Sequence, residues 1–107
     1  MASIVLNVND KKYKLEYNRA SIVKMEEKGF DVQDIESKPI STIVMLERGA
    51  FYMHNPSLED DEIDAICENV GGDEKFIAKL TELYMDALKS LTGDKKDKSK
   101  NVKWENA

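Results

Sequence analysis

The sequence has 107 residues, which corresponds to one domain with a modest hydrophobic core. Hydrophobic residues make up 41% and charged residues 35%, as is typical of a soluble globular chain and not of a disordered or membrane protein. Residues 1–92 carry 11 basic and 18 acidic side chains, a net charge of −7, whereas residues 93–107 carry +2. An acidic body repels phosphate backbones, so no nucleic-acid partner is expected.

Membrane insertion and secretion are not expected either. No apolar run approaches the ~18 residues that a membrane span needs. The N-terminal residues Met1 to Ile4 lack the basic and long apolar stretches of a secretory signal. Cys67 is the only cysteine, so it forms no internal disulfide. These features together predict a location in the cytoplasm.

Residues 4–17 predict a β-hairpin. Apolar side chains alternate with others in the runs 4–8 and 12–17, which is the period of a strand. Asn9-Asp10 between them is a turn signal, because both residue types tolerate left-handed backbone angles. A lone hairpin is marginally stable in water. We therefore expect its apolar face to be covered by the rest of the chain or by another subunit.

The period becomes helical after the hairpin. Asn18 is the expected cap of a first helix, and Gly29 is its expected left-handed end, with Phe30 folding back onto the last turn. The inward-facing candidates of this helix are Ile22, Met25 and Val23. Residues 31–38 are interpreted as a loop with space for one helical turn.

A second helix is predicted to begin at Pro39 and to end before His54-Asn55-Pro56. Its broad apolar face suits the centre of the core and contains Ile40, Ile43, Val44, Leu46, Ala50 and Phe51. Within the apolar run from Ile43 to Met53, the charged exceptions are Glu47 and Arg48.

Two more helices follow. Ser57 is the expected cap of the third, with acidic residues in its first turn and Gly71-Gly72 at its end. Its predicted buried stripe consists of Ile63, Ile66, Cys67 and Val70. The fourth helix ends before Gly93 and repeats apolar residues at steps of three and four: Phe76, Ile77, Leu80, Leu83, Tyr84, Ala87, Leu88 and Leu91.

The order of the elements predicts an α+β fold, an N-terminal hairpin followed by about four helices. We expect one domain over residues 1–92. Residues 93–107 are expected to form a flexible polar tail, because the core-like periodicity stops at Gly93.

Residues for catalysis are few. His54 is the only histidine and lies at a helix end, where its expected role is to meet the last carbonyl groups. Cys67 lies on an apolar stripe, where a free cysteine is usually inert. One His and one Cys make no zinc site, and the acids at 59–62 lack the spacing of a calcium loop. The sequence predicts neither an enzyme nor a metal or other cofactor.

Two features suggest protein binding. Met25, Met45, Met53 and Met85 lie on predicted helices, where methionine serves either the core or an adaptable partner surface. Trp104 is the only tryptophan and stands in the Lys-rich tail beside Val102. Tryptophan is enriched in binding hot spots, so the tail either docks on a partner or another copy, packs on its own domain, or stays solvated.

Several segments of the sequence resemble those of one known protein family. The run from Lys12 to Arg19, the run from Val23 to Phe30, Lys38-Pro39, the helix with Gly49-Ala50-Phe51, and the terminal Trp104 resemble small proteins of tailed bacteriophages and prophages. These belong to the tail assembly chaperone-like family. The similarity covers nearly the whole chain and lies in core, turn and cap residues.

The resemblance implies a non-catalytic chaperone that binds the tape-measure protein, keeps it soluble and helps to recruit tail-tube subunits, the major tail protein among them. It further implies a protein of the host cytoplasm that is absent from the mature virion. A homo-oligomer is expected separately, because several copies side by side on one tape-measure chain would gain effective concentration. The candidate partner-binding residues are Trp104, Val102, Phe51 and Met53, of which Phe51 is also a core candidate. Alternatives are a structural tail-completion or connector subunit of the virion, or a small regulatory binding protein.

Overall fold

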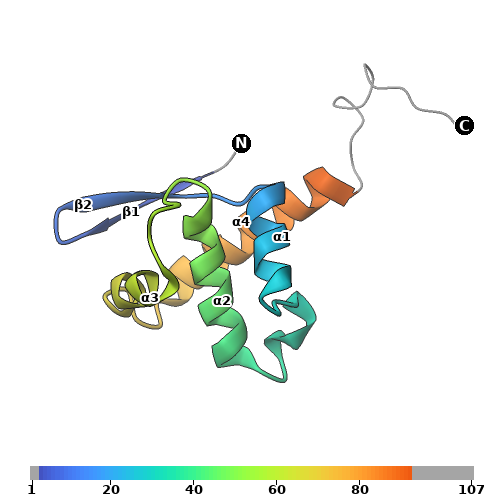
Figure 1. Cartoon of the computed structure of the whole chain (residues 1–107). Coiled ribbons are helices and arrows are strands. Elements are labelled where there is room, and N and C mark those ends of the chain that lie inside the picture. The colour runs from blue at the N-terminus through green and yellow to red at the C-terminus, as the bar shows by residue number, and fades with distance from the viewer. Residues whose placement is uncertain (1–2, 93–107) are drawn as a thin grey trace, which may run out of the picture.

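The computed structural model describes residues 3–92 and has the α+β architecture expected from the sequence, with the hairpin preceding the helices (Figure 1). The elements are β1 (Ile4–Val8), β2 (Lys11–Leu15), α1 (Arg19–Glu27), the short 3₁₀ helix η1 (Val32–Ile35), α2 (Pro39–Tyr52), α3 (Asp60–Glu68) and α4 (Glu74–Thr92). Within residues 3–92, no helix has the length and apolar character needed to cross a membrane.

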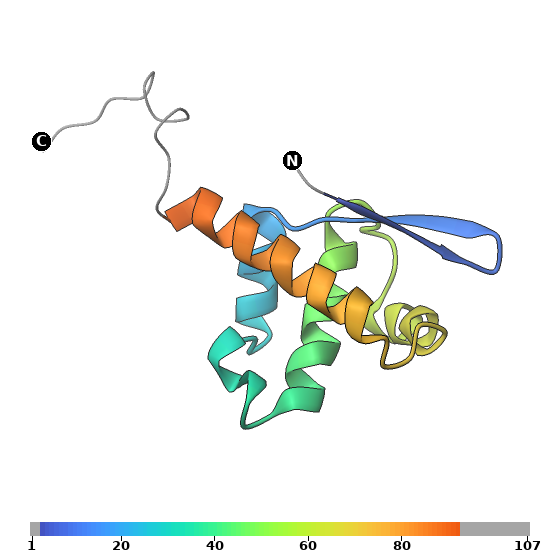
Figure 2. The same ribbon diagram turned by 180° about the vertical axis from the view of Figure 1, so that it is seen from behind.

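The hairpin forms as the sequence predicts. β1 and β2 pair antiparallel with Ile4 opposite Leu15 and Val8 opposite Lys11. Asn9 and Asp10 connect them with φ angles of 52° and 67°, as a two-residue turn of type I′ requires. The hairpin extends sideways past the helices, and its tip lies beyond α3 (Figures 1 and 2).

Both ends of α1 follow local rules. The Asn18 side chain accepts a hydrogen bond from the backbone N–H of Ser21, and the Ser21 hydroxyl accepts one from the Asn18 N–H, each at 2.8 Å. At the other end Gly29 has a φ of 100°, and the Phe30 N–H donates to the Met25 carbonyl at 3.0 Å. The chain therefore turns back, and Phe30 enters the core.

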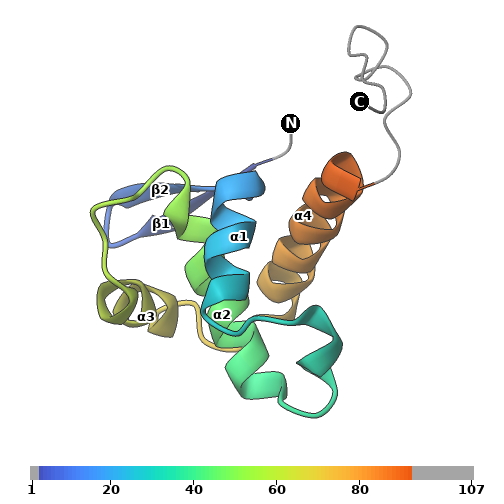
Figure 3. The same ribbon diagram turned by 45° about the vertical axis from the view of Figure 1, so that its right-hand side comes forward.

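α2 lies at the centre of the molecule, in extensive contact with α1, η1, α3, α4 and β2. Figure 3 shows α1 and α4 beside it. A side chain at Gly49 would overlap Met25, so glycine lets α1 and α2 approach closely. The buried apolar core consists of Leu15, Tyr17, Ile22, Met25, Phe30, Leu46, Ala50, Phe51, Ile63, Cys67, Leu80, Leu83 and Tyr84.

Several expected core positions are wrong. Ile40 is 75% exposed, because it lies on the opposite side of the first turn of α2 from the buried Thr42. Val23 and Leu91 are also exposed. Val70 lies beyond the end of α3 at Glu68 and is half-buried.

The predicted cap of α3 is also wrong. The helix begins at Asp60 and not after Ser57, and Glu59 is the cap residue, whose N–H donates to Glu62 Oε1 at 2.9 Å. A carboxylate three residues into the helix satisfies this N–H, so Ser57 is not needed as a cap.

Candidate binding groove

The structure separates the four residues that the sequence suggested for partner binding. Phe51 belongs to the core: its side chain is 0% exposed and offers no surface to a partner in this conformation. Met53 is half-buried just beyond α2 and lines a hollow of about 200 Å³. Trp104 and Val102 lie outside the described residues. Met53 is therefore the residue from which a site can be built.

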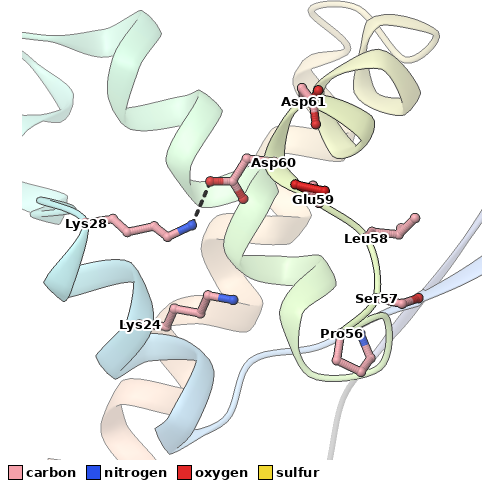
Figure 4. Close-up of a pocket in the computed structure, with 8 residues that line it drawn as sticks. All are labelled: Lys24, Lys28, Pro56, Ser57, Leu58, Glu59, Asp60 and Asp61. Atoms are coloured by element: carbon pink, nitrogen blue, oxygen red, sulfur yellow. Dashed lines mark hydrogen bonds and ion pairs between the residues drawn. The ribbon is translucent and has the colours of Figure 1, made fainter.

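The hollow beside Met53 adjoins a larger one of about 480 Å³, since Lys24 and Pro56 line both. We call the two together the α1 groove. Its walls are α1 on one side and the connection between α2 and α3 on the other (Figure 4). Its lining residues are Asn18, Ala20, Ser21, Lys24, Lys28, Tyr52, Met53, Pro56, Ser57, Leu58, Glu59, Asp60 and Asp61.

Local sequence rules place both walls. Lys24 lies in α1 and Lys28, four residues later, caps its C-terminal end, so both extend from the same side toward the segment 56–61 (Figure 4). On the other wall, the Asn55 side chain donates to the Phe51 carbonyl at 3.2 Å and to the Lys14 carbonyl at 3.1 Å. These bonds hold the end of α2 against the hairpin. They also fix the direction in which the chain continues from Asn55 into Pro56 and the connection to α3.

A polar cluster joins the walls at one end of the groove. Asp60 receives a hydrogen bond from Lys28 Nζ at 2.7 Å and another from the Tyr52 hydroxyl at 2.8 Å. The hydrogen bond to Asp60 raises the pKa of Lys28. Burial acts to raise the pKa of Asp60, but the bonds from Lys28 and Tyr52 outweigh it and lower that pKa. The pair is therefore ionised at neutral pH and connects α1 to α3.

Lys24 is the cation of the groove that can pair with an acidic group of a bound partner. Its Nζ lies 4.3 Å from the centre of the Tyr52 ring, a cation–π contact. Within residues 3–92 no carboxylate forms an ion pair with it. The groove thus offers one ammonium group, the half-buried Met53 and the Pro56 ring to whatever lies in it.

The residues with catalytic potential lie elsewhere. His54 Nε2 is 2.8 Å from Glu16 Oε1, so its partner is a carboxylate and not the helix-end carbonyls that the sequence suggested. Burial raises the pKa of the Cys67 thiol to about 12, with a further contribution from Glu47, so the thiol stays protonated. Within residues 3–92, no three His, Cys, Asp or Glu side chains form a group suited to a metal ion.

Sequence reasoning missed two features. Glu47 interrupts an apolar run in the sequence, yet it is buried in α2, and burial with the nearby Asp64 raises its pKa to about 7. The groove itself was also missed, because Lys24 and Asp60 lie far apart in the sequence. The i, i+4 spacing of two lysines on α1 is the one local signal that pointed to its wall.

Comparison with known proteins gives the family. Neither the curated proteins nor the solved structures yielded a match to this chain. A family model matches residues 1–107, the whole sequence. The chain belongs to the family described as Domain of unknown function (DUF5055).

Proposed function

We propose that this protein is a bacteriophage tail assembly chaperone, which binds the tape-measure protein, keeps it soluble and assists assembly of the tail tube without catalysing a reaction. The observation that carries the proposal is the α1 groove. It combines an apolar part around Met53 and Pro56 with charged walls, and the reactive groups His54 and Cys67 lie outside it. The sequence resemblance supplies the identity of the partner.

The shape of the groove favours a segment of a protein over a small molecule. Small-molecule sites usually enclose most of the ligand in a largely apolar cavity. The α1 groove is an open channel with Lys24 on one wall and Glu59 and Asp61 on the other. An amphipathic helix fits such a channel, with apolar side chains against Met53 and with charges aligned to the walls.

The charge of the body suits a holding function. Residues 1–92 carry −7, so copies of the protein repel one another even while their apolar surface is in use. An unassembled tape-measure protein exposes apolar helical surface that tends to aggregate. Several copies on one such chain would gain affinity from linkage, so each contact can be weak. The proposed place of action is the cytoplasm of the bacterial host.

Co-expression tests the proposal. The cognate tape-measure protein should be more soluble with this protein than without it at matched expression, and the two should co-elute on sizing. Lys24→Glu should reduce that soluble fraction, because it reverses the available charge of the groove. Lys75→Glu makes the same charge change on the exposed start of α4 and serves as the matched control.

Other outcomes would redirect the proposal. Equal solubility of the tape-measure protein with and without this chain contradicts the chaperone function. Recovery of the protein from purified virions by mass spectrometry would instead indicate a tail-completion or connector subunit. A tight one-to-one complex with an unrelated host protein would indicate a regulatory binder.

A further inference from the structure

The two outer edges of the hairpin differ. On β2, the Lys14 carbonyl accepts a hydrogen bond from the Asn55 side chain at 3.1 Å. Just after β2, the Glu16 N–H donates to the Ala50 carbonyl at 3.0 Å. The outer edge of β2 is therefore covered at its Lys14 end by the end of α2 and the loop that follows.

The register then shows which groups form the other edge. In an antiparallel pair, residues alternate between those bonded to the opposite strand and those that point outward. Lys14 points outward from β2, and its partner across the hairpin is Val5, while Lys12 is opposite Asn7. Val5 and Asn7 therefore direct their backbone N–H and C=O groups outward from β1. Within residues 3–92, no turn, loop or side-chain hydrogen bond reaches these groups, so the edge is open.

The open strand is also the unprotected one. Proteins commonly guard exposed edges with lysine or proline. In this hairpin Lys11, Lys12 and Lys14 all lie on β2, whose edge is partly covered, whereas β1 contains no charge and no proline. Val5 is 56% exposed on the solvent face of β1. The extensive contacts of β1 are with β2, so the helices do not cover its outer side.

We propose that the open edge of β1 pairs antiparallel with β1 of a second copy, giving a four-stranded sheet in the order β2-β1-β1-β2. The inference is independent of the identity of the tape-measure partner. A two-fold axis beside Leu6 would place Val5 opposite Asn7 of the second copy, so that both residues of each edge find partners. The hairpin extends past the helices, so the edge is accessible (Figures 1 and 2).

The uncharged strand β1 suits a second copy as the occupant, and the repulsion between the two bodies, each carrying −7 over residues 1–92, is one reason to expect a weak dimer. The lysines lie on β2, so they would stand on the two outermost strands, about 14 Å apart at ~4.8 Å per strand. That separation exceeds the screening length of ~8 Å at physiological salt, and repulsion between them is small. An uncharged edge does not select a charged segment of a different protein, whereas its own strand matches it in length and hydrogen-bonding pattern. A four-stranded sheet is also more stable than a lone hairpin.

The pairing is expected to be reversible. Two five-residue strands bury far less than the ~1,000 Å² of a stable interface, so the dimer should form and dissociate with concentration. Sedimentation equilibrium of the full chain should show monomer and dimer between roughly 10 μM and 1 mM. Hydrogen exchange should show protection of the Val5 and Asn7 amides that rises with concentration, while the outward-pointing Lys12 amide should show no such rise.

Proline substitution separates the two edges. Val5→Pro removes an N–H that the hairpin does not use, and should weaken dimerisation roughly 10- to 100-fold through one lost hydrogen bond per copy. Lys12→Pro makes the equivalent change on β2 and should leave dimerisation unchanged. Val5→Glu is a second variant that keeps the N–H, faces Lys14 across the hairpin, and should also weaken the dimer by placing charge on the edge.

Three results would overturn the proposal. One is a monomer throughout the concentration range. Another is a dimer that Val5→Pro and Val5→Glu leave intact while both variants keep the circular dichroism of the parent. The third is protection of the Val5 and Asn7 amides that does not depend on concentration, which would mean that another part of the same chain covers the edge.

Discussion

The hairpin and the helical body are stabilised in different ways. In the body, α2 packs against three helices, η1 and β2, and side chains such as Phe51, Ile63 and Leu80 are fully buried. In β1, every side chain is half-buried or exposed, and the strand is held mainly through β2. The free energy of folding therefore resides mostly in the body, while β1 of the hairpin retains backbone N–H and C=O groups that are free to pair with another strand.

The junction between the two regions is narrow. The Tyr13 ring of β2 lies 5.7 Å from the Phe51 ring of α2, centre to centre, and Leu15 is fully buried. After β2, Tyr17 donates a hydrogen bond from its hydroxyl to the Leu46 carbonyl at 2.6 Å. The inner face of β2 is thus part of the core, whereas β1 is one strand further out. This gradient of burial can be tested by substitutions along it.

The largest expected effect is at the junction. Phe51→Ala should lower the free energy of unfolding by roughly 3–5 kcal/mol, because it leaves a cavity at the centre of the core. Val5→Ala, on the exposed face of β1, should change it by no more than about 0.5 kcal/mol. Urea denaturation of both variants measures the contrast. Similar losses for the two would show that the hairpin and the body contribute equally.

A pH effect should belong to the body alone. Burial and the charge of Asp64 raise the pKa of Glu47 to about 7, above its ordinary value of 4.5. The folded state therefore binds this proton more tightly than the unfolded state. The resulting stabilisation is complete below about pH 4.5 and is lost as the pH rises through about 7.

Glu47→Gln isolates that contribution. The variant should gain stability relative to the parent as the pH rises from 5 to 8, by on the order of 1–3 kcal/mol. The difference between parent and variant, taken from urea denaturation at each pH, cancels the titration of the other carboxylates. A difference that stays constant with pH would show that Glu47 does not titrate in this range.

The smallest expected effect is in the turn of the hairpin. Asp10 has a φ of 67°, in the left-handed region that glycine adopts without strain. Asp10→Gly should stabilise the hairpin by about 0.5–1 kcal/mol, since Asn-Gly is the favoured pair for this turn. Hydrogen exchange at the Leu6 and Val8 amides should slow several-fold, while the melting temperature changes little. A large rise in melting temperature would mean that the hairpin and the body unfold together.

Local patterns in the sequence predicted the elements well. The Asn9-Asp10 turn, the Asn18 cap and the Gly29 stop each depend on neighbours within four residues, and all three are present. The errors occur where distant packing decides. Ile40 and Val23 fit an apolar stripe in the sequence but face solvent, because no other element lies against those positions.

The candidate site was predictable only in fragments. Met53 was singled out as a methionine at a helix end, and it lines the groove. The sequence suggests Phe51 for both the core and a binding surface, and the structure puts it in the core. The ion pair of Lys28 with Asp60 joins positions 32 residues apart, a separation that no local pattern encodes.

The sequence by itself determined the order and type of the elements, most of their boundaries, and that the body is acidic, because these depend on backbone propensity, spacing and composition. The tertiary structure decided which apolar stripes are covered, that Glu47 is buried, and that two lysines of α1 face the loop before α3. It also decided that the end of α2 covers part of the lysine-bearing edge of the hairpin and leaves the uncharged edge open. The reason is that burial and edge pairing depend on which distant segments come into contact. A local sequence pattern does not specify those contacts.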